Sequence, residues 1–150
     1  MIGAIGETIG AVAVVATLLY LGRQISQTNR ITTATGAREL QQQYAHLYSL
    51  IATDPQIAEL VTRFRHQDYV AQSPQEEEKV ESFSLLLAGI WLTTAIAYEQ
   101  GQIDRTMYRI YCADVTVKLS RWPGLRPYLV NLMSKYPGGE GFEIFQPLLK

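Results

Sequence analysis

The first stretch of the chain is an almost unbroken run of apolar and small residues. Between Ile9 and Leu21 only two residues carry a polar group, and extending the run back to Ile2 adds only two more. About twenty helical residues span about 30 Å, which is the thickness of the hydrocarbon core of a bilayer. The run therefore predicts a transmembrane helix, which we place at residues 1–23.

The flanks of this run indicate an anchor that is not cleaved. No Lys or Arg precedes it and no small-x-small site follows it, so it lacks the pattern of a secretory signal. Arg23, Arg30 and Arg38 all follow the run. This excess of basic residues on one side predicts that the N-terminus lies outside and the rest of the chain is cytoplasmic. Cys112 is the only cysteine, which suits a reducing compartment.

Glu7 is the one acidic residue inside the run. Near the N-terminus of a helix its carboxylate complements the helix dipole, and its side chain leans toward the membrane interface. We interpret Glu7 as an interfacial residue. The alternative is a group that relays protons or ions within the membrane.

The small residues of the anchor share one face of the predicted helix. Small residues four positions apart let two transmembrane helices approach closely. The sequence therefore predicts a packing face for another membrane helix, which belongs either to a second copy or to a different protein. The members of this face are Gly3, Gly6, Gly10, Ala13 and Thr17.

Residues 24–53 are predicted to form a helix that leaves the membrane. The segment begins polar, and an apolar stripe at helical spacing returns between Ala37 and Ala52. Several threonines and Gly36 weaken the middle of the segment, because both residue types have low helix propensity. We therefore expect that the helix could break near Gly36.

Residues 54–150 carry the start and stop signals of a small helical domain. Asp54, Ser73 and Asp104 are capping side chains, and a proline follows the first two at the initial helical position. The tail FEIFQPLLK is expected to pack back on the domain as a short helix. We predict an all-α chain, with an N-terminal transmembrane helix followed by a bundle of about five helices. The expected stops are Gly101, Pro123-Gly124 and Pro137-Gly138-Gly139.

The segment Ser82–Tyr98, SFSLLLAGIWLTTAIAY, contains no charged residue. Its length is at the lower limit for a membrane span, and acidic residues lie directly upstream. We interpret it as a central helix that is buried on nearly all sides, with a second membrane span as the alternative. In so small a domain, one of its faces is expected to meet a partner or the bilayer surface.

The opening of the chain, IGETIGAVAVV followed by LLYLGRQISQTNR, resembles a family of uncharacterised bacterial membrane-anchored proteins. The resemblance implies one N-terminal membrane helix, a helical cytoplasmic domain and a location in the bacterial inner membrane, but it implies no activity and no functional residues. It covers nearly the whole chain. Further elements that carry it are Asp54-Pro55, the helix start before LLLAGIW, the segment YEQGQID, Pro123-Gly124 and the final FEIFQ.

The central helix departs from the pattern of that family. Where relatives tend to have basic residues and an acidic residue paired with Asn, this chain has the uncharged run LTTAIA. The loss of charge predicts a surface that something else covers. The residues that we expect to face a partner are Trp91, Leu92, Thr94 and Ala95.

Composition and charge exclude one class of partner. Charged residues make up 18% of the chain, against a usual value of about 25%, which favours contact with lipid or protein. The formal net charge is −1 and no basic stripe interleaved with aromatic residues is present, so no nucleic-acid partner is expected.

The sequence contains few candidate catalytic or metal-binding residues. His46 and His66 have no metal-ligand partner at helical spacing, and no nucleophile or phosphate-loop motif surrounds Cys112 or the glycines at 138–141. Glu76–Glu78 is interpreted as a solvated helix start. The tyrosine pairs at helical spacing are interpreted as core or interface aromatics.

We therefore expect no catalytic residue, no metal site and no cofactor. The sequence predicts a non-enzymatic, membrane-anchored accessory or scaffold subunit of a larger membrane protein complex. Its partners would be the lipid bilayer and other membrane protein subunits, or further copies of itself. The alternative is a homo-oligomeric anchored sensor that binds a small ligand, and an enzyme that uses Cys112 or the carboxylates is a weaker third reading.

Overall fold

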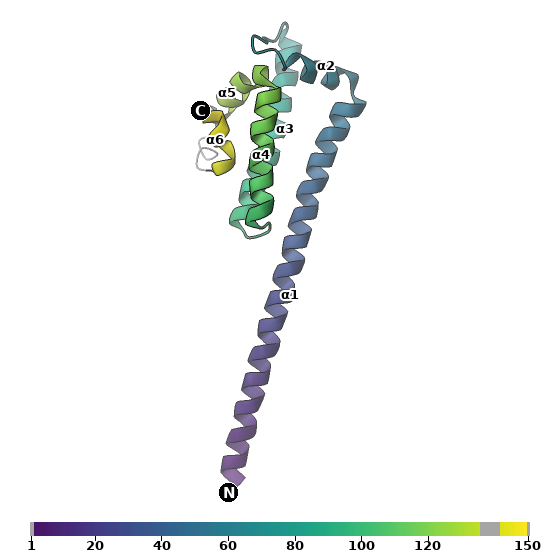
Figure 1. Cartoon of the computed structure of the whole chain (residues 1–150). Coiled ribbons are helices and arrows are strands. Elements are labelled where there is room, and N and C mark those ends of the chain that lie inside the picture. The colour runs from purple at the N-terminus through teal and green to yellow at the C-terminus, as the bar shows by residue number, and fades with distance from the viewer. Residues whose placement is uncertain (1, 136–141, 150) are drawn as a thin grey trace.

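The computed structural model describes the backbone of residues 2–135 and 142–149, and their side chains apart from those of residues 2–13, 15, 16 and 30. Every regular element in these ranges is a helix (Figure 1). The prediction of an all-α fold is confirmed. One very long helix, α1, carries the shorter helices alongside its second half, and its first half extends away from them (Figure 1).

Helix α1 runs without interruption from Ile2 to Thr53, over 52 residues. The break considered near Gly36 is therefore absent. The threonines in this region are accommodated because their hydroxyls donate hydrogen bonds to carbonyls one turn earlier. Thr28 bonds the carbonyl of Gln24 and Thr33 that of Asn29, each at 2.9 Å.

Gly36 is explained by packing rather than by a break. A Cβ atom at this position would lie 2.7 Å from the carbonyl oxygen of Gln102. Only glycine lets the turn after α3 come this close to α1. The low helix propensity of residue 36 is thus offset by a contact that is remote in the sequence.

The next three helices begin where the capping residues predict. These helices are α2 (Pro55–Arg63), α3 (Pro74–Glu99) and α4 (Arg105–Arg121). The side chains of Asp54, Ser73 and Asp104 each accept hydrogen bonds from backbone N–H groups of the first turn. The three predicted N-caps are confirmed. Gly101 ends α3 with a φ of 68°, a conformation that favours glycine.

Helix α3 lies at the centre of the core. Its two largest buried side chains are Trp91 and Phe83, and Phe83 meets Trp122 edge to face with 6.0 Å between ring centroids. The expectation of a central buried helix is confirmed for most of its circumference, but one face stays exposed. Its buried residues are Val80, Phe83, Ser84, Leu87, Ala88, Ile90, Trp91, Thr94, Ala95 and Ala97.

The second half of α1 belongs to the same core. Leu40, Tyr44 and Leu47 are buried there at the four- and three-residue spacing that the sequence shows. The helical domain therefore includes this part of α1 and does not begin at residue 54. No boundary interrupts α1 between the ranges 1–23 and 24–53.

The C-terminal segments close the domain. Outside residues 136–141 and 150, which the structure does not describe, they comprise two 3₁₀ turns, η1 (Pro123–Leu125) and η3 (Glu143–Phe145), and two short helices, α5 (Arg126–Lys135) and α6 (Gln146–Leu149). The expectation that the tail packs back on the domain is confirmed, because Ile144, Phe145 and Leu148 are buried.

Candidate functional site

The predicted packing face of the anchor lies mostly outside the described side chains. Gly3, Gly6, Gly10 and Ala13 fall there, as does Glu7. Thr17 is exposed on α1. The packing face and the role of Glu7 therefore stay predictions.

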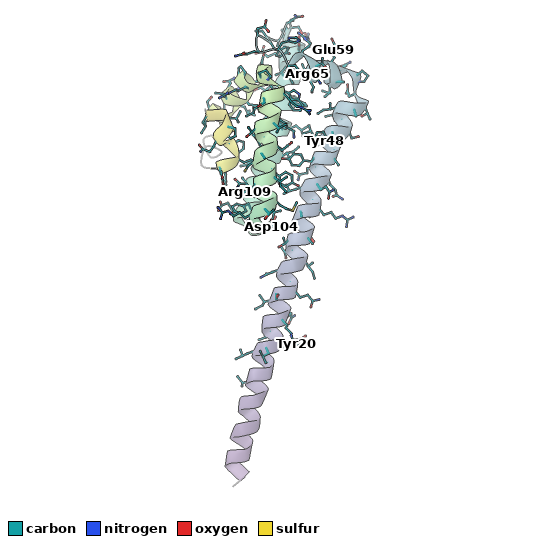
Figure 2. All side chains as sticks on the ribbon, in the orientation of Figure 1. Tyr20, Tyr48, Glu59, Arg65, Asp104 and Arg109 are labelled. Carbon is teal, nitrogen blue, oxygen red and sulfur yellow. The ribbon has the colours of Figure 1, made fainter. Side chains whose placement is uncertain are left out.

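The described part of the first half of α1 exposes large apolar side chains. Leu18 and Leu19 are 62% and 65% exposed, and Val14 is similar. Tyr20 lies on the same stretch, well away from the rest of the domain (Figure 2). Burying such a side chain is worth about 1.5–3 kcal/mol, and the described domain buries none of Val14, Leu18 and Leu19.

The expectation that Trp91, Thr94 and Ala95 face a partner is corrected by the structure. All three side chains are fully buried inside the domain. The prediction was wrong because other helices of the same chain surround α3. Most of its apolar residues therefore lie in the core, and only a narrow stripe of them faces outward.

The exposed face of α3 is an apolar stripe made of Leu85, Gly89, Leu92 and Ile96. The three large side chains are 45%, 37% and 40% exposed, and Gly89 is exposed between them. Spacings of four, three and four residues place the stripe along one line of the helix, in the pattern of a seam between two packed helices. Of the four residues predicted to face a partner, Leu92 alone belongs to it. The heptad spacing in the sequence was the signal that could have identified it.

Grooves run beside this stripe. One of about 680 Å³ lies between α1 and α3, with Leu85, Gly89 and Thr93 on one side and polar residues of α1, including Glu39 and His46, on the other. A second, of about 450 Å³, continues past Leu86 toward α2. The two grooves are open and are lined by both apolar and polar side chains, which suits a docking helix better than an enclosed small ligand.

A polar and aromatic cluster joins α1 to α4. The ammonium group of Lys118, whose side chain is only 4% exposed, pairs with Asp114 and donates a hydrogen bond of 3.0 Å to the hydroxyl of Tyr48. It also lies 5.1 Å and 5.2 Å from the ring centroids of Tyr44 and Tyr48. These contacts compensate for the burial of the charge. The cluster therefore holds α1 and α4 together.

Stacked tyrosines extend this cluster. Tyr44 stacks on Tyr111 with 4.8 Å between centroids, and Tyr98 stacks on Tyr108 at 4.2 Å. The interpretation of the tyrosines as core aromatics is confirmed for Tyr44 and Tyr108, which are buried. Burial also raises the pKa of Tyr108 to about 12, so this phenol stays protonated at neutral pH.

A second polar cluster fixes the loop between α2 and α3. The carboxylate of Glu76 accepts hydrogen bonds from the hydroxyl of Tyr69 at 2.6 Å and from the N–H of Gln72 at 3.0 Å, and it pairs with Arg63 at 2.5 Å. The hydrogen bond from Tyr69, more than any other contact, lowers the pKa of Glu76. Glu76 is thus a structural residue and not simply a solvated one.

The residues that could act in catalysis or bind a metal ion do not lie close together. Among the described residues no group of three or more His, Cys, Asp and Glu side chains is placed to hold a metal ion. His46 lies on α1 and His66 in the turn after α2, and both are exposed. Burial raises the pKa of Cys112, which disfavours the reactive thiolate. The glycines at 138–141 lie outside the described residues.

One helix in the described part of the chain, α3, is long and apolar enough to cross a membrane by length and composition. Its most apolar stretch has a mean hydropathy of 1.6, and half of that stretch is buried inside the domain. Core helices of soluble proteins meet the same criterion, so the observation is weak evidence for a span. Comparison of the chain with protein-family models, curated proteins and solved structures finds no match.

Proposed function

We propose that the protein is a non-enzymatic, membrane-anchored accessory subunit that holds a partner protein at the cytoplasmic side of a bacterial inner membrane. The exposed apolar side chains in the first half of α1 carry this proposal. They continue a run that the sequence predicts to be a membrane anchor. A bilayer covers such a helix on all sides, whereas the domain covers none of the side chains at Val14, Leu18 or Leu19.

The stripe on α3 supports the second part of the proposal, which is the docking of a partner. Its exposed side chains are aligned along one helix and border an open groove. A helix of a partner that packs on Leu85, Leu92 and Ile96 would remove these apolar surfaces from water, and Gly89 would allow a close approach. In this arrangement α1 positions the domain and α3 presents the docking surface.

The assignment of α3 to the core rather than to the membrane follows from its buried residues. Ser84 and Thr94 satisfy their hydroxyls within the helix, and the surrounding helices cover Trp91 and Leu87. Moving α3 into a bilayer would require the core of the domain to come apart. We therefore propose a single anchor, at residues 1–23.

Native sizing of the full chain after extraction in mild detergent tests the docking role. We expect the protein to co-elute with other polypeptides, and a variant that combines Leu85→Glu with Leu92→Glu to lose them. Ile110→Glu is the matched control, because Ile110 is also an exposed apolar residue but lies on α4. A discrete assembly of this chain alone would favour the homo-oligomeric alternative. Co-elution that survives the double substitution would contradict docking at the stripe.

A further inference from the structure

One side of α1 connects the predicted membrane anchor with the grooves beside α3. The α1 wall of these grooves begins at Glu39 and ends at Leu50. An α-helix returns to the same orientation after about five turns, or about 18 residues, and α1 is unbroken over its whole length (Figure 1). The groove wall therefore has a counterpart one such interval earlier on the helix. We call this side the α1 line, and its members are Leu21, Ile25, Thr28, Thr32, Glu39, Gln43, His46 and Leu50.

The first half of the α1 line is an open surface of apolar and small side chains. Leu21 and Ile25 are 45% and 61% exposed. Thr28 and Thr32 are also exposed, and their hydroxyls donate hydrogen bonds of 2.9 Å and 3.1 Å to carbonyls one turn earlier in α1. These threonines therefore present small side chains with satisfied hydroxyls, which a second helix can approach closely.

The basic residues that follow the predicted anchor avoid the α1 line. Arg23 and Arg30 come two positions after Leu21 and Thr28, and two positions turn a helix by about 200°. Their backbone positions therefore lie on the opposite side of α1, and the line itself carries no charged residue before Glu39. Such a division favours a protein contact along the line, with water and lipid headgroups on the other side.

The same line continues back into the predicted anchor. Gly3 and Gly10 precede Leu21 and Thr28 by about five turns of the same helix. Both glycines belong to the packing face that the sequence predicts for the membrane. The predicted packing face in the membrane and the grooves beside α3 thus lie on one side of α1, where a single straight helix can contact both.

We propose that the partner is a different membrane protein, and that one of its helices leaves the bilayer beside α1 and continues along the α1 line into the grooves beside α3. The inference rests on the accessory function proposed above and names the element of the partner that docks. From Leu21 to His46 the helical rise is about 38 Å, so the partner helix extends about 25 residues beyond the membrane. Where it passes Leu85 and Gly89, its side that faces α3 is apolar.

Charge favours a different protein over a second copy of this chain. Two copies anchored in one membrane are parallel, so a symmetric pair that meets along the α1 line places Glu39 opposite Glu39 of the second copy. Like charges at this distance are unfavourable. Glu39 takes part in none of the ion pairs found among the described residues. A neutral or basic residue of the partner at this level suits it better.

Photocrosslinking of the full chain in its native membrane tests the inference. Ile25→Cys and Gln43→Cys, each with Cys112→Ser, carry a benzophenone maleimide at two levels of the α1 line. Gln27→Cys and Gln41→Cys are the matched controls, because they are exposed and lie two positions away, on the other side of α1. We expect residues 25 and 43 to crosslink to the same polypeptide, and the controls to lose this adduct.

Mass spectrometry of the adducts locates the crosslinked sites in the partner. For one continuous helix, the two sites should lie about 18 residues apart in the partner sequence, with the site reached from residue 25 nearer its hydrophobic span. Adducts with two different polypeptides would overturn the inference. An adduct between two copies of this chain would overturn it in favour of a second copy.

The pattern of adducts also separates this inference from the proposed function. If residue 43 crosslinks to another protein while residue 25 crosslinks to lipid alone, the docking role stands and the continuous helix is wrong. If neither residue crosslinks to a protein, both fail. Extraction of the same membranes with alkaline carbonate reports on the anchor alone, because a chain that is released by it has no membrane span.

Discussion

Gly36 of α1 and Gln102 of the turn after α3 are in a backbone contact so close that a Cβ atom on residue 36 would lie 2.7 Å from the carbonyl oxygen of Gln102. This contact fixes the level at which the long helix meets the domain. It also determines which end of the domain points toward the anchor. The close approach of this turn to α1 therefore depends on the absence of a side chain at residue 36, while Leu40, Tyr44 and Leu47 hold the next turns of α1 in the core.

The first prediction concerns this contact. Gly36→Ala should lower the free energy of unfolding by about 1–3 kcal/mol, because the carbonyl of Gln102 is backbone and cannot move aside easily. Gly22→Ala is the matched control on the same helix. A Cβ at Gly22 meets nothing within 4 Å, so this change should be neutral or stabilising by up to about 1 kcal/mol. Denaturant titration followed by the fluorescence of Trp91 and Trp122 measures both, and equal effects would refute the role of the contact.

The second prediction concerns the buried ion pair of Lys118. Asp114→Asn should cost about 3 kcal/mol, because it leaves a buried ammonium without its carboxylate. Lys118→Met should cost clearly less than Asp114→Asn, because the carboxylate of Asp114 is 27% exposed and stays in contact with water, while the apolar side chain fills the space beside the rings of Tyr44 and Tyr48. In the double variant the cost of Asp114→Asn should largely disappear. Additive losses in this double-mutant cycle would show that the two groups are not coupled.

The third prediction concerns the cluster around Glu76. At neutral pH, Glu76→Gln should lower the stability by about 1–3 kcal/mol, because the carboxylate loses its pair with Arg63 and weakens its bond with Tyr69. Glu77→Gln, at the exposed neighbouring position, is the control and should have little effect.

The pH dependence of this cluster follows from the direction of its pKa shift. The folded protein lowers the pKa of Glu76, so the carboxylate contributes stability above its ordinary pKa and that contribution is lost as the pH falls through the lowered value. The difference between the wild type and Glu76→Gln should therefore shrink in acid. A difference that is constant from neutral pH to strong acid would contradict this assignment.

The helix boundaries could be predicted from the sequence because they depend on local contacts. Asp54, Ser73 and Asp104 bond N–H groups within three residues of themselves, so a short window of sequence contains the whole interaction. The buried stripe of Leu40, Tyr44 and Leu47 was accessible for a similar reason, since a period of three to four residues identifies one face of a helix.

The features that the sequence did not reveal depend on distant partners. From its neighbours in the sequence, Gly36 is expected to weaken the helix, and only the contact with Gln102 explains why glycine occupies this position. Lys118 reads as an ordinary surface lysine one turn after Asp114, and only the approach of Tyr48 from α1 shows that it is buried. For the candidate docking surface, the sequence identified the uncharged run on α3. It did not show that Trp91 is buried in the core while the neighbouring Leu92 is exposed.

The most direct test of the central claim, a single anchor formed by the first half of α1, is the accessibility of single cysteines in membranes that contain the full chain. Leu18→Cys, Ile31→Cys and Leu92→Cys are each made with Cys112→Ser and treated with a maleimide after the membranes have been opened. All three native side chains are exposed within the chain, so shielding reports on the membrane or a partner. Residue 18 should be shielded and residue 31 labelled, while residue 92 should become labelled once mild denaturant removes any docked partner. Full labelling at residue 18, or shielding at residue 92 that persists while residue 18 is open, would contradict the account and place the span in α3.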